Sequence, residues 1–148
     1  MRRVIFICTG NTCRSAMAEG LFRTLLEKEG INNIECSGAG TGAFPGDPAQ
    51  QNAVLAAAEF GADISAHRAR KYNCFMDSEY DLFVCMTQTH RQFLCNIPSE
   101  KAIVLAGGIP DPYGGDLHEY RQCAERILEG LEELLKSPDF NKLLTETD

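Results

Sequence analysis

The hydrophobic pattern of this chain alternates between short apolar runs and longer stretches with helical spacing. Residues 4–7 (Val-Ile-Phe-Ile) form a continuous β-rich run, which is typical of a strand buried on both faces of a sheet. Comparable runs predict three further strands, at residues 34–36, 80–86 and 102–105.

Helical patterns occupy the segments between these strands. Met17, Leu21 and Leu25 recur at four-residue intervals after the first strand, and Gly30 is a typical helix end. Further helices are predicted at residues 48–60, 87–95 and 116 to about 136. This alternation favours an α/β fold, with a single open four-stranded parallel sheet and helices on both faces.

Length and composition indicate one globular domain over residues 1–148, with a C-terminal tail from about residue 137. The net charge of −7 argues against nucleic-acid and anionic-membrane partners, because both select clustered Lys and Arg. No apolar run approaches the roughly 18–20 residues that a membrane span needs. We therefore expect a cytoplasmic protein and a monomer.

The seven cysteines are odd in number and form no Cys-x-x-Cys pair. This pattern disfavours both a secreted disulfide framework and a zinc site, so no metal is expected. Cys8 and Cys13 stand apart from the other five because they share one loop.

The loop of residues 8–15, Cys-Thr-Gly-Asn-Thr-Cys-Arg-Ser, connects the first strand to the first helix. At this edge of a parallel sheet, inward-facing backbone N–H groups and the helix dipole form a cradle for an anion. Gly10 permits close approach of the backbone, and the guanidinium of Arg14 can hold two phosphate oxygens. The same field favours the thiolate of Cys8, which predicts covalent phosphoryl transfer.

Such a reaction also needs a proton donor for the leaving atom, a contribution of roughly 10²–10⁴-fold. Asp111 opens the loop Asp-Pro-Tyr-Gly-Gly-Asp at residues 111–116 and is the candidate acid. The same carboxylate could then take a proton from the water that hydrolyses phospho-Cys8. The alternative interpretation of Asp111 is a turn residue before Pro112.

The strings CTGNTCRS and DPYGGD resemble the low-molecular-weight protein tyrosine phosphatase family, and nearly the whole chain fits its length and element order. The resemblance implies a flavodoxin-like sheet of four parallel strands and no metal or cofactor. It implies that Cys8 is the nucleophile, Arg14 the phosphate clamp and Asp111 the general acid. Asn11 would hold the shape of the loop, and Ser15 would donate a hydrogen bond to the Cys8 thiolate.

Further roles follow from the same resemblance. Ser37 and His67 match positions that hydrogen-bond to the loop asparagine, whereas His90 and His118 stand alone and are predicted to be surface residues. The expected substrate-binding residues are Thr9, Gly10, Asn11, Thr12, Cys13, Ser15 and Tyr113.

Cys13 has two interpretations. It could be a small packed side chain, or it could resolve oxidised Cys8 into a reversible disulfide. The second interpretation predicts that inactivation by mild peroxide is reversed by dithiothreitol.

Phosphorylated proteins are the expected substrates, and Thr12 bears on which residue is phosphorylated. Tyrosine phosphatases of the family commonly have an aliphatic residue at this position, whereas a branch resembling protein arginine phosphatases has Thr. Near Phe44 small residues dominate, and Tyr113 is followed by Gly114 instead of a second tyrosine. Together these features favour phosphoarginine, with phosphotyrosine as the alternative.

Two other functions are alternatives to a protein phosphatase. A thioredoxin-coupled arsenate reductase shares the loop but needs a further close cysteine pair, and Cys85 and Cys95 are ten residues apart. A phosphocarrier domain also places a cysteine after its first strand, but it needs neither Arg14 nor Asp111.

Overall fold

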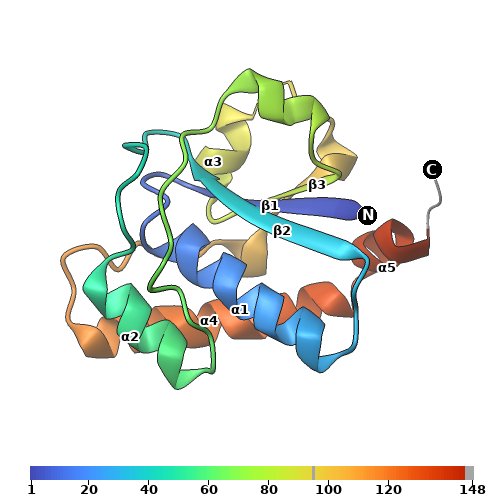
Figure 1. Ribbon diagram of the computed structural model, residues 1–148. Helices are drawn as coiled ribbons and strands as arrows, with labels where there is room; N and C mark the ends of the chain where they lie inside the picture. The colour runs from blue at the N-terminus through green and yellow to red at the C-terminus, as the bar shows by residue number, and fades with distance from the viewer. Residues whose placement is uncertain (95, 146–148) are drawn as a thin grey trace.

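The computed structural model describes residues 1–94 and 96–145, and its centre is a sheet of four parallel strands (Figure 1). The strands lie in the order β2-β1-β3-β4. Their bounds are Arg2–Cys8 for β1, Ile34–Gly40 for β2, Leu82–Cys85 for β3 and Ala102–Val104 for β4. The predicted fold class, a four-stranded parallel α/β sheet, is confirmed.

Strand β1 lies at the centre of the sheet, which explains its continuous apolar run. Val4 and Phe6 belong to the core on one face, and Ile5 and Ile7 belong to the core on the other. Successive side chains of a strand point to opposite faces, so a strand that is covered twice must be apolar at every position.

The two faces are covered unequally (Figure 1). Helices α1 (Arg14–Lys28), α2 (Gln51–Glu59) and α4 (Leu117–Leu135) pack together on one face. The short helix α3 (Gln88–Phe93) and a 3-10 helix at Cys74–Ser78 lie on the other. The last position of the helix predicted at 87–95, Cys95, lies outside the described residues.

The expected C-terminal tail is instead a helix over most of its length. Helix α5 (Pro138–Thr145) begins after Ser137, whose hydroxyl accepts a hydrogen bond from the N–H of Phe140 at 3.2 Å. The ring of Phe140 is fully buried and meets Phe22 of α1 edge to face, with 5.8 Å between ring centroids. Phe140, together with the buried side chain of Leu143, therefore docks the segment on the core.

Helix α2 begins three residues later than predicted because the preceding segment bonds elsewhere. Pro48 forms an isolated bridge with Arg68, and the N–H of Gln50 donates to the carbonyl of Thr12 at 2.9 Å. The start of α2 is thereby fixed to the loop after β1.

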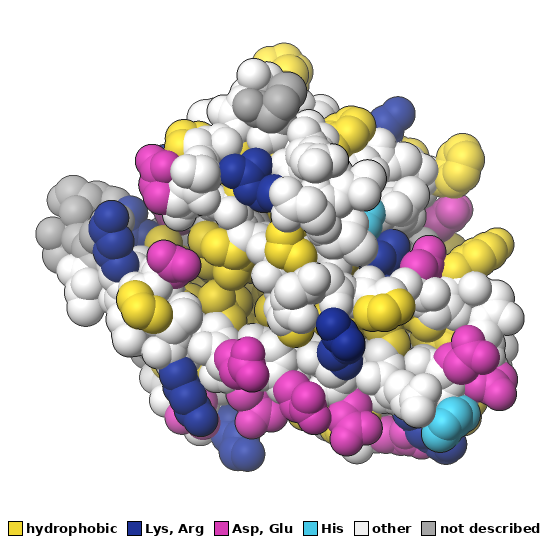
Figure 2. Space-filling model, turned by 180° about the vertical axis from the view of Figure 1, so that it is seen from behind, with side chains coloured by type: hydrophobic (Ala, Val, Ile, Leu, Met, Phe, Trp, Pro, Cys, Tyr) yellow, Lys and Arg dark blue, Asp and Glu magenta, His cyan; other side chains and the backbone are white. Residues whose placement is uncertain are grey.

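Many of the acidic residues that make the net charge negative lie on the outer side of α4. Figure 2 shows acidic side chains along the edge where α2 and α4 lie. Glu125, Glu129, Glu132 and Glu133 are all exposed, as expected of a solvated helix face. Among the described residues, no helix has the length and apolar character to cross a bilayer.

Candidate active site

The loop after β1 is enclosed at the carboxyl edge of the sheet. Cys8 is the last residue of β1 and Arg14 is the first of α1, and both are buried. Strand β2 approaches the loop so closely that a Cβ at Gly40 would collide with the carbonyl oxygen of Thr9. Glycine at position 40 is therefore required for this close approach.

Two hydrogen-bond donors surround the sulfur of Cys8. The backbone N–H of Asn11 lies 3.2 Å from Sγ, and the hydroxyl of Ser15 lies 2.8 Å from it. Ser15 Oγ already accepts a hydrogen bond from Asn11 Nδ2 at 2.7 Å, which leaves the hydroxyl proton for the sulfur. Both donors stabilise a negative charge on Cys8.

Asn11 holds the shape of the loop through contacts with two further residues, Arg70 and His67. It is fully buried with φ of 55°, a left-handed conformation that costs free energy outside glycine. Its Oδ1 accepts from the N–H of Arg70 at 2.9 Å, and its carbonyl lies 2.6 Å from Nε2 of His67. The placement of His67 beside Asn11 agrees with its expected supporting role.

Ser37 does not lie where the sequence predicted it. Within the part of the chain that the structure describes, it makes no hydrogen bond to Asn11. Successive positions of β2 point to opposite faces of the sheet, and position 38 rather than 37 is on the side of Asn11. A Cβ at Gly38 would stand 2.8 Å from Asn11 Nδ2.

Arg14 and Asp111 meet above the loop. Nη1 of Arg14 donates to the carbonyl of Ile109 at 3.0 Å, and Nη2 lies 3.6 Å from Oδ2 of Asp111. The other carboxylate oxygen accepts from the N–H of Tyr113 at 3.0 Å, which fixes the turn around Pro112. The Asp111 side chain is 52% exposed, so it can reach a group that enters from solvent.

A cavity of about 500 Å³ opens over this loop. Thr9, Gly10 and Thr12 form the wall on the loop side, and the exposed rings of Phe44 and Tyr113 contribute to the lining. Thr12 and Tyr113 thus line the same cavity, and their role in binding substrate stays a prediction. Phe44 supplies the aromatic ring that the sequence left uncertain.

Cys13 lies at the start of α1 and packs against α4. Its Sγ is 3.5 Å from the hydroxyl of Tyr120. Burial raises the pKa of the Cys13 thiol, and the hydrogen bond from Tyr120 opposes this rise. Cys13 is therefore mainly a thiol at neutral pH, and its role as a redox partner of Cys8 stays a prediction.

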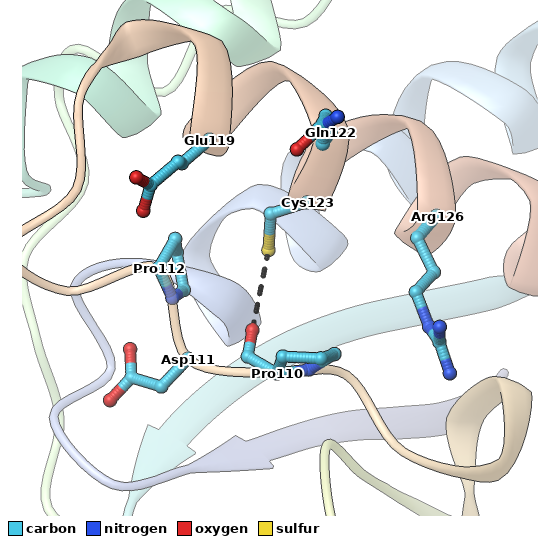
Figure 3. A pocket seen from close by; sticks show the side chains of 7 residues that line it. All are labelled: Pro110, Asp111, Pro112, Glu119, Gln122, Cys123 and Arg126. Carbon is cyan, nitrogen blue, oxygen red and sulfur yellow. Dashed lines mark hydrogen bonds between the residues drawn. The ribbon is translucent and has the colours of Figure 1, made fainter.

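A second cavity, of about 350 Å³, lies on the far side of the Asp111 loop (Figure 3). Pro110 and Pro112 face Cys123 of α4 across it, and Sγ of Cys123 lies 3.9 Å from the carbonyl of Pro110. Figure 3 shows the Asp111 carboxylate pointing away from α4. Helix α4 thus backs the loop that presents Asp111.

His90 is buried, so its prediction as a surface residue was wrong, whereas His118 is exposed as expected. The His90 ring lies 2.9 Å from the hydroxyls of both Thr9 and Thr87. A lone histidine carries no sequence signal of burial. The available hint was Thr87, a typical helix N-cap that places the histidine in the first turn of α3.

Comparison with known proteins identifies relatives of this chain. Residues 3–144 match the model of a family described as low molecular weight phosphotyrosine protein phosphatase. A protein-arginine-phosphatase of Bacillus subtilis is 34% identical over 143 residues, which span 90% of this chain and 94% of that protein. A low molecular weight protein-tyrosine-phosphatase of Streptomyces coelicolor is 35% identical over 144 residues, which span 84% and 86%.

Solved structures agree with these sequence matches. A low molecular weight protein tyrosine phosphatase from T. tengcongensis superposes with a TM-score of 0.84 at 36% identity, covering 92% of this chain and 99% of that one. A mutant of the YwlE arginine phosphatase that carries a phosphorylated active-site serine superposes with a TM-score of 0.83 at 32% identity. The match covers 92% of this chain and 97% of that one.

Proposed function

The chain belongs to the low molecular weight phosphotyrosine protein phosphatase family, and on that premise we propose that it hydrolyses phosphoarginine on proteins through a phosphocysteine at Cys8. The observation that carries the substrate class is the loop-side wall of the cavity. Thr9, Gly10 and Thr12 line it, and none of them presents a large aliphatic side chain to a phenyl ring.

In the first step, the Cys8 thiolate attacks phosphorus while the loop amides and Arg14 hold the phosphoryl oxygens. The new S–P bond forms as the P–N bond breaks, and Asp111 gives its proton to the departing guanidine nitrogen. In the second step, the Asp111 carboxylate takes a proton from water as the water oxygen attacks phosphorus. The S–P bond breaks, inorganic phosphate is released and Cys8 returns to the thiolate.

The polar wall suits a guanidinium because hydroxyl oxygens accept hydrogen bonds from its N–H groups. The carboxylates of Asp47, at the cavity, and Asp111, beside Arg14, add negative charge that favours a cationic leaving group. A phenyl ring would gain binding energy neither from the hydroxyl oxygens of the wall nor from the negative charge of the carboxylates. Phosphotyrosine remains the alternative substrate, since Phe44 and Tyr113 can pack against a ring.

A thioredoxin-coupled arsenate reductase is disfavoured by Cys85. This residue is fully buried in β3, and burial raises the pKa of its thiol to about 12. A disulfide relay needs an accessible thiolate, which Cys85 does not offer. Cys95, the other cysteine considered for such a relay, lies outside the described residues.

Substitution of Thr12 tests the substrate class. We expect wild type to have the higher kcat/KM on a phosphoarginine peptide than on a phosphotyrosine peptide of matched sequence. Thr12→Ile should move this ratio about tenfold toward phosphotyrosine, because it replaces a hydroxyl with hydrocarbon in the wall.

Thr24→Ile is the matched control, since Thr24 lies on α1, does not line the cavity, and its hydroxyl donates to the carbonyl of Gly20. It should leave the ratio unchanged. If wild type prefers phosphotyrosine, phosphoarginine is not the main substrate and the alternative, phosphotyrosine, takes its place. If Thr12→Ile leaves the ratio unchanged, Thr12 does not determine the substrate preference.

A further inference from the structure

His90 links α3 to the wall of the cavity through two threonines. Nε2 of its ring lies 2.9 Å from Thr9 Oγ1, and Nδ1 lies 2.9 Å from Thr87 Oγ1. Thr9 itself lines the cavity of about 500 Å³ beside the loop, whereas His90 is only 5% exposed and does not line it. The histidine can therefore act on a substrate only through Thr9.

The donors and acceptors at hand favour one placement of the protons on Thr87, His90 and Thr9. Thr87 Oγ1 already accepts from the backbone N–H of His90 at 3.3 Å. We assign its own proton to His90 Nδ1, since the Thr87 hydroxyl contacts no other acceptor among the described residues. The neutral ring then carries its proton on Nε2 and donates it to Thr9 Oγ1. This leaves the Thr9 hydroxyl proton free to point into the cavity.

The surroundings of His90 favour this neutral ring. Burial and, to a smaller extent, the positive charge of Arg14 lower the pKa of His90 to about 4, against the opposing negative charge of Asp111. At neutral pH the ring therefore has one donor and one acceptor, as the assigned chain requires.

We infer that His90 is a positioning residue, which holds Thr9 so that its hydroxyl donates to a phosphoryl oxygen of the bound substrate. The inference rests on the proposed function only in requiring a phosphoryl group in the loop. The hydrogen bond from Thr9 is made to the phosphoryl group, which every phosphorylated substrate has. It therefore contributes to turnover whichever residue is phosphorylated.

Two variants of His90 separate positioning from packing. In His90→Gln the side-chain amide can place an N–H near the position of Nε2 and still donate to Thr9. In His90→Asn the amide reaches only the position of Nδ1, so the Thr9 contact is lost. With p-nitrophenyl phosphate, we expect His90→Asn to lower kcat/KM about fivefold, the loss expected for one misdirected hydrogen bond, and His90→Gln to restore most of it.

A double-mutant cycle identifies Thr9 as the mediator. In a Thr9→Val background, His90→Asn should change kcat/KM by less than about twofold, because the hydroxyl that it orients is gone. Equal losses in both backgrounds, or a His90→Gln variant as impaired as His90→Asn, would overturn the inference. His118→Gln serves as the control for an exposed histidine, and thermal unfolding of each variant checks that it folds.

The choice of p-nitrophenyl phosphate keeps this test separate from the substrate class. If the cycle gives the expected coupling while phosphoarginine peptides are poor substrates, the inference stands and the proposed substrate fails. If phosphoarginine is preferred but the cycle shows no coupling, the inference fails alone.

Discussion

At the scale of single residues, the account depends on which atom holds each proton near Cys8. Asn11 Nδ2 occupies an acceptor site on Ser15, and this directs the Ser15 proton to the sulfur. A similar constraint, from Thr87 through His90, directs the Thr9 proton toward the cavity. Both chains place a hydroxyl donor where negative charge is held during the reaction.

Because His90 is buried and neutral, stability should depend on pH. Its pKa is about 4 in the folded protein against an ordinary value of 6.5, so between these values the unfolded chain binds a proton that the native protein does not. Stability is therefore lost as pH falls through this window. Urea unfolding should show wild type losing roughly 2 kcal/mol more than His90→Gln between pH 7 and pH 5.

Other groups titrate in both proteins, so only the difference between them reports on His90. The loss in wild type should exceed that in the variant because Arg14 and burial together disfavour the imidazolium. Identical losses would mean that His90 is protonated in the native protein over this range.

At the scale of elements, the turn after β4 delivers Asp111 to the loop. Ala106, Gly107 and Gly108 all have positive φ, a sharp change of direction at the end of the strand. Arg126 of α4 fixes this turn, since its Nη2 donates to the carbonyl of Gly108 at 2.7 Å and to that of Ala106 at 3.3 Å. The position of the acid thus depends on a side chain that does not line the cavity beside the loop of residues 8–15.

Arg126→Ala should loosen this turn. We expect a loss of about 1 kcal/mol in the free energy of unfolding, from two partly exposed charged hydrogen bonds, and a severalfold lower kcat because Asp111 is less well placed. Chemical denaturation and steady-state kinetics measure the two effects.

Arg121→Ala is the matched control on the same helix. Arg121 pairs with Glu59 at 2.8 Å on the surface and does not touch the turn, so kcat should stay at the wild-type value. If kcat is also unchanged in Arg126→Ala, the hydrogen bonds of Arg126 to the turn are not needed to place Asp111.

The order of the elements could be read from the sequence, whereas several contacts between them could not. Periodicity identified β1 and α4 because each has many apolar positions at one spacing. It missed α5, whose eight residues offer few apolar positions, although Pro138 at the helix start and Phe140 were signals. Ser37 was misplaced because the resemblance assigned it by its position in the sequence, whereas the alternation of side chains along β2 turns position 38 toward Asn11.

At the scale of the whole molecule, the carboxyl ends of the four parallel strands all contribute to one site. The end of β1 supplies the loop, and the end of β2 binds it, since the N–H of Thr41 donates to the carbonyl of Cys8 at 2.9 Å. The segment after β3 supplies His90, and the segment after β4 supplies Asp111. The linear motif predicted Cys8 and Arg14, but only the folded chain brings His90 to Thr9.

The central claim is that Cys8 receives the phosphoryl group during turnover, and a rapid-quench experiment tests it most directly. Wild-type protein is mixed with saturating phosphoarginine peptide, quenched in denaturant within the first turnover and digested for mass spectrometry, with Cys8→Ala as the control. The account predicts one phosphoryl group on Cys8 in wild type and none in the control. Phosphate release with no phosphoryl group on Cys8, or a phosphoryl group on another side chain, would contradict it.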